Sequence, residues 1–202
     1  MAESAVLMCA RLTLGEADAQ RIIDASIKLS PRHYVYIVLS LNTGARVGEV
    51  AKIEVEALDA RTSCILLHLQ KKKRPAPTWR KVHPDVFGEV RYCLQKMGIE
   101  SGPIFTGRVG KARHATTRTL QSLYYESAKA AGVDVGAPAS LPHAHGKGPH
   151  SQRHMRGTWL ANVGADMSAI MQQLGHQNVA TSLVYIATSR VKDKVRNLPG
   201  VA

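Results

Sequence analysis

The chain has 202 residues, 45% of them hydrophobic, which is enough to bury the core of one ordinary domain and argues against a disordered chain. Lysine and arginine number 27 against 15 acidic residues, and the net charge of +12 favours a polyanionic partner: DNA, RNA or an anionic membrane surface. The sequence shows no run near the ~20 apolar residues of a membrane span, no signal-peptide pattern, and no CxxC pair among Cys9, Cys64 and Cys93. These features argue against membrane proteins, secreted proteins and disulfide scaffolds, and predict reduced thiols in the cytosol.

The first half of the chain predicts three helices followed by a β-hairpin. A helix opens over 14–23 with acidic residues in its first turn and Thr13 as its cap, Pro31 begins a second helix, and a short third helix covers 46–53. The clearest strand is 64–69. It leads into a cationic tip at 70–74, a proline-rich turn and a second strand at about 79–82.

The second half is predicted to be helical. Helices are expected over 84–97 and 116–131, with a basic loop at 107–114 between them. Gly, Pro, Ala and His fill a long loop at 132–149, and three helices follow at 151–163, 167–174 and 179–187 before a basic tail. The predicted fold is therefore one mainly α domain that carries a small antiparallel β-hairpin, an α+β arrangement.

The segment Thr43-Gly44-Ala45-Arg46-Val47-Gly48-Glu49 is the first candidate for chemistry. Glycine permits a turn that a side chain would obstruct, and Arg46 then lies at a helix start, where phosphate binds readily. Glu49 lies one turn further on, placed to orient an arginine or a histidine. Taken alone, this pattern is also typical of a solvated helix face.

Three further pieces follow in the C-terminal helices. His150, Arg153 and His154 share one helical face at positions i, i+3 and i+4, which favours an anion between them, although a solvated polar face has the same pattern. Leu174-Gly175-His176 is a helix end with Gly as its cap. Tyr185 comes nine positions after His176, and a lone tyrosine on an apolar helix is most often a core or rim residue.

Together, these pieces resemble the catalytic domain of the tyrosine recombinase (phage integrase) family. The family's TGxRxxE box is matched at 43–49, its LGH box at 174–176, and the interval of nine to Tyr185 is the usual one. The HxLRH box appears as HSQRH, with Gln152 in place of Leu, a change expected to affect packing more than chemistry. The resemblance runs from about residue 12 to the tail, nearly the whole chain.

The resemblance implies one catalytic domain over 1–202, with a core at about 12–187 and a basic tail at 188–202. The tail either docks on a neighbouring subunit or touches DNA. The additional N-terminal domain of most family members is expected to be absent, so the chain resembles either a compact single-domain recombinase or an excised catalytic fragment.

The resemblance also implies roles in DNA cleavage through a covalent 3′-phosphotyrosyl intermediate. Tyr185 would attack phosphorus, while two arginines would stabilise the oxygens without a metal or other cofactor. Replacing either arginine with alanine is expected to slow cleavage and leave folding largely intact. Arg46 and Arg153 would bind the scissile phosphate, with His176 as a further phosphate ligand and Glu49 as support for the site. His150 would be the proton acceptor or a phosphate ligand. Lys71, or else Lys73, would protonate the leaving 5′-oxygen.

Other cations are predicted to contact backbone phosphates, which position DNA without reading its sequence: Lys72, Lys73, Arg74, Arg80, Lys111 and Arg113. A zinc site is the alternative use of the histidines at 143, 145, 150 and 154. The loop holds no Cys and places Lys147 among these histidines, so no metal site is predicted.

The expected partner is double-stranded DNA, bound by a homotetramer on paired sites, with a monomer or weak oligomer in the absence of DNA. The expected location is the cytoplasm, at the nucleoid, for a bacterial, phage or plasmid protein. Two alternatives remain: a catalytically silent DNA-binding relative, which the intact set of polar residues disfavours, and a type IB topoisomerase, which the short chain and the LGH box disfavour.

Overall fold

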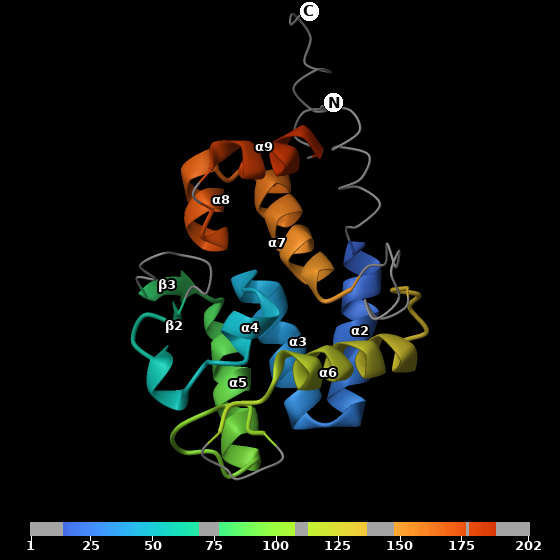
Figure 1. The fold of residues 1–202 in the computed structure, drawn as a ribbon, viewed down its shortest axis with the longest axis vertical. Coiled ribbons are helices and arrows are strands. Elements are labelled where there is room, and N and C mark those ends of the chain that lie inside the picture. Colours follow the sequence, from blue (N-terminus) through green and yellow to red (C-terminus); the bar gives the residue numbers. More distant parts are fainter. Residues whose placement is uncertain (1–13, 69–76, 108–112, 137–147, 177, 189–202) are drawn as a thin grey trace, which may run out of the picture.

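The computed structural model describes residues 14–68, 77–107, 113–136, 148–176 and 178–188. Figure 1 shows helices α2 to α6 beside a small sheet, with α8 and α9 gathered at the far end of α7. The mainly α class with a small antiparallel sheet is thus confirmed. Within the ranges above, no helix is both long and apolar enough to cross a membrane.

Helix α3 (Pro31–Thr43) is the central helix of the fold, and α2 (Glu16–Leu29) packs along it. The hydroxyl of Ser30 accepts a hydrogen bond from the backbone N–H of His33, and a proline follows at the first helical position. The apolar run from Val35 to Leu39 is buried on all sides. Thr13, the cap predicted for α2, lies outside the described residues, and that helix starts after Gly15.

The predicted hairpin is present and gains a third strand. Strand β2 (Cys64–His68) pairs antiparallel with β3 (Pro77–Lys81) and with the two-residue strand β1 (Leu58–Asp59). The two residues of β1, which follow the short helices α4 (Val47–Val50) and η1 (Val55–Ala57), are too few for a period-2 pattern to reveal. The hairpin tip, residues 69–76, lies outside the described residues.

The remaining helices match their predicted bounds closely. They are α5 (Pro84–Lys96), α6 (Thr117–Ala130), α7 (His150–Asn162), α8 (Met167–Leu174) and α9 (Val179–Thr188). Asp166 caps α8 by accepting from the backbone of Ala169, and Gly175 ends it with φ +66°. Residues 137–147 of the loop predicted at 132–149, and residues 189–202 of the tail predicted at 188–202, fall outside the described residues.

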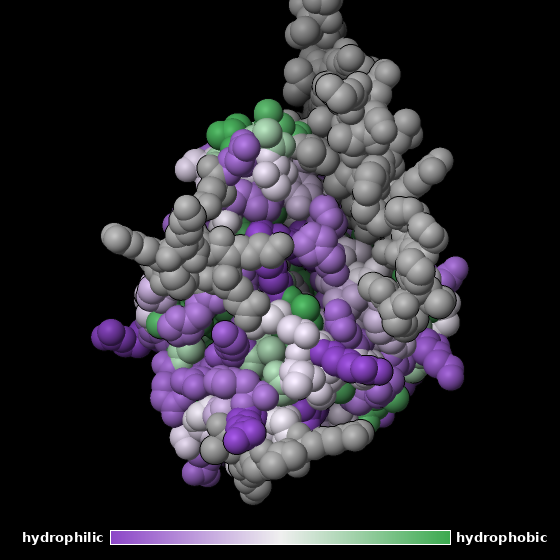
Figure 2. Space-filling model, viewed as in Figure 1, coloured by the Kyte–Doolittle hydropathy of each residue, from purple (hydrophilic) through white to green (hydrophobic). Residues whose placement is uncertain are grey.

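The buried apolar residues form two separate clusters. The large core joins α2 to α6 and the sheet, and in it the rings of Tyr36 and Phe105 meet edge to face at 6.1 Å. The small C-terminal cluster consists of Ala161, Ile170, Leu174 and Tyr185, on helices α7 to α9. Figure 2 shows further apolar residues on the surface at the α9 end, where Val179 and Leu183 are exposed.

Candidate active site

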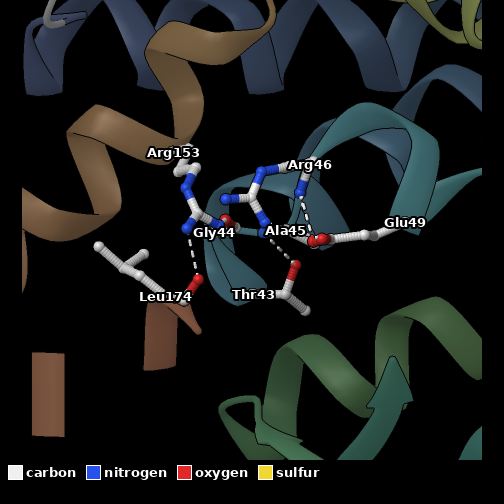
Figure 3. A network of polar contacts seen from close by, with 7 residues as sticks. All are labelled: Thr43, Gly44, Ala45, Arg46, Glu49, Arg153 and Leu174. Atoms are coloured by element: carbon white, nitrogen blue, oxygen red, sulfur yellow. Dashed lines mark hydrogen bonds and ion pairs between the residues drawn. The ribbon is translucent and has the colours of Figure 1, made fainter. Parts of the chain in front are cut away.

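The turn between α3 and α4 brings Arg46 and Glu49 together. Gly44 ends α3 with φ +61°, and a Cβ built there would lie 2.5 Å from Leu174 Cδ2, so the turn needs glycine for its backbone and for close packing. The carboxylate of Glu49 accepts from the backbone N–H of Arg46 at 2.9 Å and from its Nη1 at 3.0 Å (Figure 3). Glu49 is 1% exposed and the Arg46 side chain 29%, so the buried carboxylate holds a guanidinium that solvent reaches.

Arg153 joins this turn to the C-terminal helices. Its Nη1 donates to the carbonyl oxygen of Gly44 at 2.7 Å, and its Nη2 donates to the carbonyl oxygen of Leu174 (Figure 3). Burial, together with the neighbouring charge of Arg46, lowers the pKa of Arg153 to about 10. Loss of this side chain would leave two carbonyl groups without their donor, so alanine at 153 is expected to lower stability as well as the rate of cleavage.

Arg80 is a third arginine of this region, and it is 2% exposed. It lies opposite Ile65 in the sheet, and burial lowers its pKa to about 10, an effect that nearby Glu49 opposes and nearby Arg46 reinforces. A side chain so deeply buried does not fit the surface phosphate contact predicted for it. The signal in the sequence was strand alternation, since Arg80 and the apolar Val82 are two positions apart and share a face.

Within the part of the chain that the structure describes, Glu49 is the one buried carboxylate beside these three arginines. Three guanidinium charges against Glu49 leave a surplus of two positive charges, and the charges of Arg46 and Arg80 both lower the pKa of Arg153. Mutual repulsion of this kind is relieved by a bound anion. The arrangement therefore suits a phosphate group, whose oxygens two arginines can approach in a forked geometry.

Tyr185 lies against this cluster on α9 and is 3% exposed, and its phenol is near enough to raise the pKa of Arg153. A Cβ built at Gly157 would lie 2.7 Å from the tyrosine ring, and the ring of His176 stacks on it at 6.0 Å and 11°. Leu183, two residues earlier on α9, is 51% exposed, whereas Gly157 of α7 and His176 both lie against the ring.

Two histidines contact Tyr185, and a third contacts one of these two. Burial, with the neighbouring charges of Arg153 and Arg46, lowers the pKa of His176 to about 4, so its imidazole is neutral at pH 7. Its Nδ1 lies 2.7 Å from Ser182 Oγ. The Tyr185 hydroxyl lies 3.2 Å from Nδ1 of His154. The exposed His150 meets His154 edge to face at 4.8 Å.

The sequence indicates His154 only as part of an anion-binding helix face or as a metal ligand, and its contact with the Tyr185 hydroxyl is visible only in the structure. Gln152, which stands where the family has Leu, is buried, and neither atom of its amide group has a hydrogen-bond partner in the described part of the chain. Burial of this amide without a hydrogen-bond partner is the physical reason to expect that Gln152 affects packing and stability.

Arg113 is exposed. Five other predicted residues lie outside the described residues: Lys71, Lys72, Lys73, Arg74 and Lys111. The described ranges contain no group of three or more His, Cys, Asp or Glu side chains that could hold a metal ion. His143 and His145 are outside these ranges.

Comparison with known proteins gives related sequences. Tyrosine recombinase XerC of Lactobacillus delbrueckii subsp. bulgaricus is 25% identical over 165 residues, which cover 80% of this chain and 52% of that protein. Type 1 fimbriae regulatory protein FimB of Escherichia coli K12 is 26% identical over 165 residues, covering 78% of this chain and 74% of FimB. The chain thus spans about half the length of the XerC relatives.

Solved structures share the fold. The crystal structure of XerA recombinase superposes with a TM-score of 0.68 at 22% identity, over 91% of this chain and 60% of that one. XerH site-specific recombinase, bound to palindromic difH substrate in a post-cleavage complex, superposes with a TM-score of 0.70 at 17% identity, over 91% of this chain and 52% of that one. The Phage integrase family profile matches residues 13–191, nearly the whole chain, which therefore belongs to the phage integrase (tyrosine recombinase) family.

Proposed function

We propose that this chain is the catalytic domain of a site-specific DNA recombinase, which cleaves and rejoins strands through a covalent 3′-phosphotyrosyl intermediate. The observation that carries the proposal is the surplus of positive charge on Arg46, Arg80 and Arg153 directly beside Tyr185. A phosphodiester supplies the missing negative charge. The pentacoordinate transition state carries more negative charge than the ground state, so this site stabilises the transition state selectively.

The proposed reaction uses each group in a different way. Tyr185 attacks phosphorus and stores the energy of the broken bond in the phosphotyrosyl link, which a free 5′-hydroxyl later attacks in exchange. Arg46, partly open to solvent, and Arg153 donate to the non-bridging oxygens. Lys71, or else Lys73, protonates the leaving 5′-oxygen.

Double-stranded DNA is the proposed partner, bound by four protomers on paired sites in the cytoplasm, at the nucleoid. The net charge of +12 supports a polyanion, and Lys72, Lys73, Arg74, Lys111 and Arg113 are the proposed backbone contacts. Related proteins in solved structures include XerH bound to palindromic difH substrate and a lambda integrase dimer bound to a COC′ core site. These relatives support duplex DNA as the substrate class.

Covalent trapping tests the proposal and does not require a defined target sequence. The 202-residue protein is incubated with a pool of nicked duplexes whose central sequences are randomised, and denaturing gels reveal protein joined to DNA. We expect adduct with a 3′-phosphate attached at Tyr185 and a free 5′-hydroxyl on the other fragment. Tyr185→Phe should retain fold and DNA affinity but form no adduct, since it lacks only the attacking oxygen.

Tyr92→Phe provides the matched control, because this tyrosine is exposed on α5 and belongs to neither the arginine cluster nor the C-terminal helices. It should form adduct at the wild-type rate. Adduct that persists in Tyr185→Phe, or that maps to another tyrosine, would refute the assignment of the nucleophile. Adduct accompanied by relaxation of supercoiled plasmid, with no strand exchange, would indicate topoisomerase activity instead.

A further inference from the structure

The hydroxyl of Tyr185 contacts the imidazole of His154 on α7. The hydroxyl of Tyr185 lies 3.2 Å from Nδ1 of His154, within hydrogen-bond distance, and the two rings are 5.8 Å apart with a tilt of 52°. The tyrosine ring is fixed on its other sides by Gly157 and by the stacked ring of His176. The hydroxyl is therefore directed at one ring nitrogen on α7.

His154 is in a suitable state to receive a proton. Burial lowers its pKa, and the neighbouring charge of Arg153 lowers it further, so the imidazole is neutral at pH 7. A neutral imidazole has one donor nitrogen and one acceptor nitrogen. With the phenol as donor at Nδ1, the tautomer that fits this contact carries its proton on Nε2.

The other two histidines, His176 and His150, differ from His154 in the contacts that they make. His176 presents the face of its ring to Tyr185, and its Nδ1 lies against the hydroxyl of Ser182 at 2.7 Å. His150 is the exposed first residue of α7, with its ring against His154. It therefore lies where phosphate or solvent meets the site.

We propose that His154, to which the resemblance gives no role, accepts the phenolic proton of Tyr185 during attack on DNA, in place of His150. The inference rests on the function proposed above. As the Oη–H bond breaks, its proton moves to Nδ1 and its electron pair forms the Oη–P bond. The P–O5′ bond breaks with its electron pair on the 5′-oxygen, which takes a proton from the hairpin lysine, and His154 is left as an imidazolium until religation returns its proton.

The test separates proton transfer from positioning. His154→Asn places an amide oxygen near the position of Nδ1, so it can still accept a hydrogen bond from Tyr185 but cannot take up the proton. We expect cleavage of the trapped duplexes to slow by ~100-fold or more, the scale for losing a general base, with DNA affinity unchanged. Replacing Tyr185 with fluorotyrosine, whose phenol is more acidic, should restore part of the rate in His154→Asn.

A duplex with a bridging 5′-sulfur at the cleavage site is the control that separates loss of the proton acceptor from loss of the lysine that protonates the leaving group. Sulfur leaves without protonation, so this substrate should rescue a lysine variant at position 71 or 73 and should not rescue His154→Asn. Cleavage by His154→Asn at the wild-type rate, or loss of cleavage that fluorotyrosine does not relieve, would overturn proton transfer to His154. Absence of adduct from the wild-type protein would instead contradict the proposed function itself.

Nitrogen NMR of the wild-type protein gives a second measurement that does not depend on a variant of His154 folding. At neutral pH the Nδ1 signal of His154 should be that of an unprotonated nitrogen, and it should move in Tyr185→Phe, which removes the hydrogen-bond donor. A protonated Nδ1 in the wild-type protein would overturn the proposal.

Discussion

The two halves of the candidate site are attached to apolar clusters of very different size. Arg46, Glu49 and Arg80 extend from elements of the large core, which joins five helices and the sheet. Tyr185 belongs to the small C-terminal cluster, in which it is one of only four buried apolar members described. Less buried apolar area means a smaller free energy of local opening, so the nucleophile is held less firmly than the anion-binding residues.

This difference suits a reaction in which the phosphate must be fixed while the nucleophile attacks and is later displaced. Arg153 connects the two regions, because it donates to Gly44 from the large core and to Leu174 from the small cluster. A phosphate bound by Arg153 would therefore affect the hydrogen bonds of both regions.

Glu49→Gln should have the largest effect on stability, because it leaves Arg46, Arg80 and Arg153 without their shared buried carboxylate. Removing one partner of a buried ion pair typically lowers the free energy of unfolding by about 3–5 kcal/mol. Denaturant unfolding measures this change. Glu126→Gln is the control, since its exposed carboxylate contacts His33 and should contribute less than about 1 kcal/mol. Equal effects of the two substitutions would contradict a buried charge network at Glu49.

Gln152→Leu should increase stability. The substitution removes an amide that is buried without a hydrogen-bond partner among the described residues, and it places an apolar side chain of similar size there. An unsatisfied buried polar group costs ~1–3 kcal/mol, so a gain within this range is expected in denaturant unfolding. Gln172→Leu, at an exposed position on α8, should stay within about 0.5 kcal/mol of the wild type. A loss of stability in Gln152→Leu would show that the amide is satisfied in solution.

The C-terminal region should also be the more sensitive to acid. His176 has an ordinary pKa of 6.5 when unfolded and about 4 when folded, mainly because of burial. The unfolded chain then binds more protons between these values, so stability falls as the pH drops from 6.5 towards 4. His176→Asn should make the free energy of unfolding depend less on pH between 6.5 and 4, as measured by denaturant unfolding at a series of pH values. A variant curve parallel to that of the wild type would refute the lowered pKa.

Much of the fold was predictable from the sequence because its signals are local. Pro31 and Pro84 open helices, Gly44 and Gly175 end them, and these signals fixed the helix bounds to within a few residues. The family boxes brought Arg46, Arg153 and Tyr185 into one site. The depth of each side chain was not predictable, because burial depends on contacts between distant segments. Arg80 is the clearest case, since its charge suggested the surface while its strand alternation pointed inward.

The smallest expected effect comes from one helical glycine in each region. Gly88 lies on α5, where a Cβ would meet nothing within 4 Å, so Gly88→Ala should raise the free energy of unfolding by ~1 kcal/mol through helix propensity alone. Gly157→Ala gains the same propensity on α7, but its Cβ would lie 2.7 Å from Cε1 and Cζ of Tyr185, so the ring must shift. That shift should cancel most of the gain and slow adduct formation, because the hydroxyl moves relative to His154 and the arginines. Equal stabilisation by both substitutions, together with an unchanged rate of adduct formation, would show that α7 does not position the nucleophile.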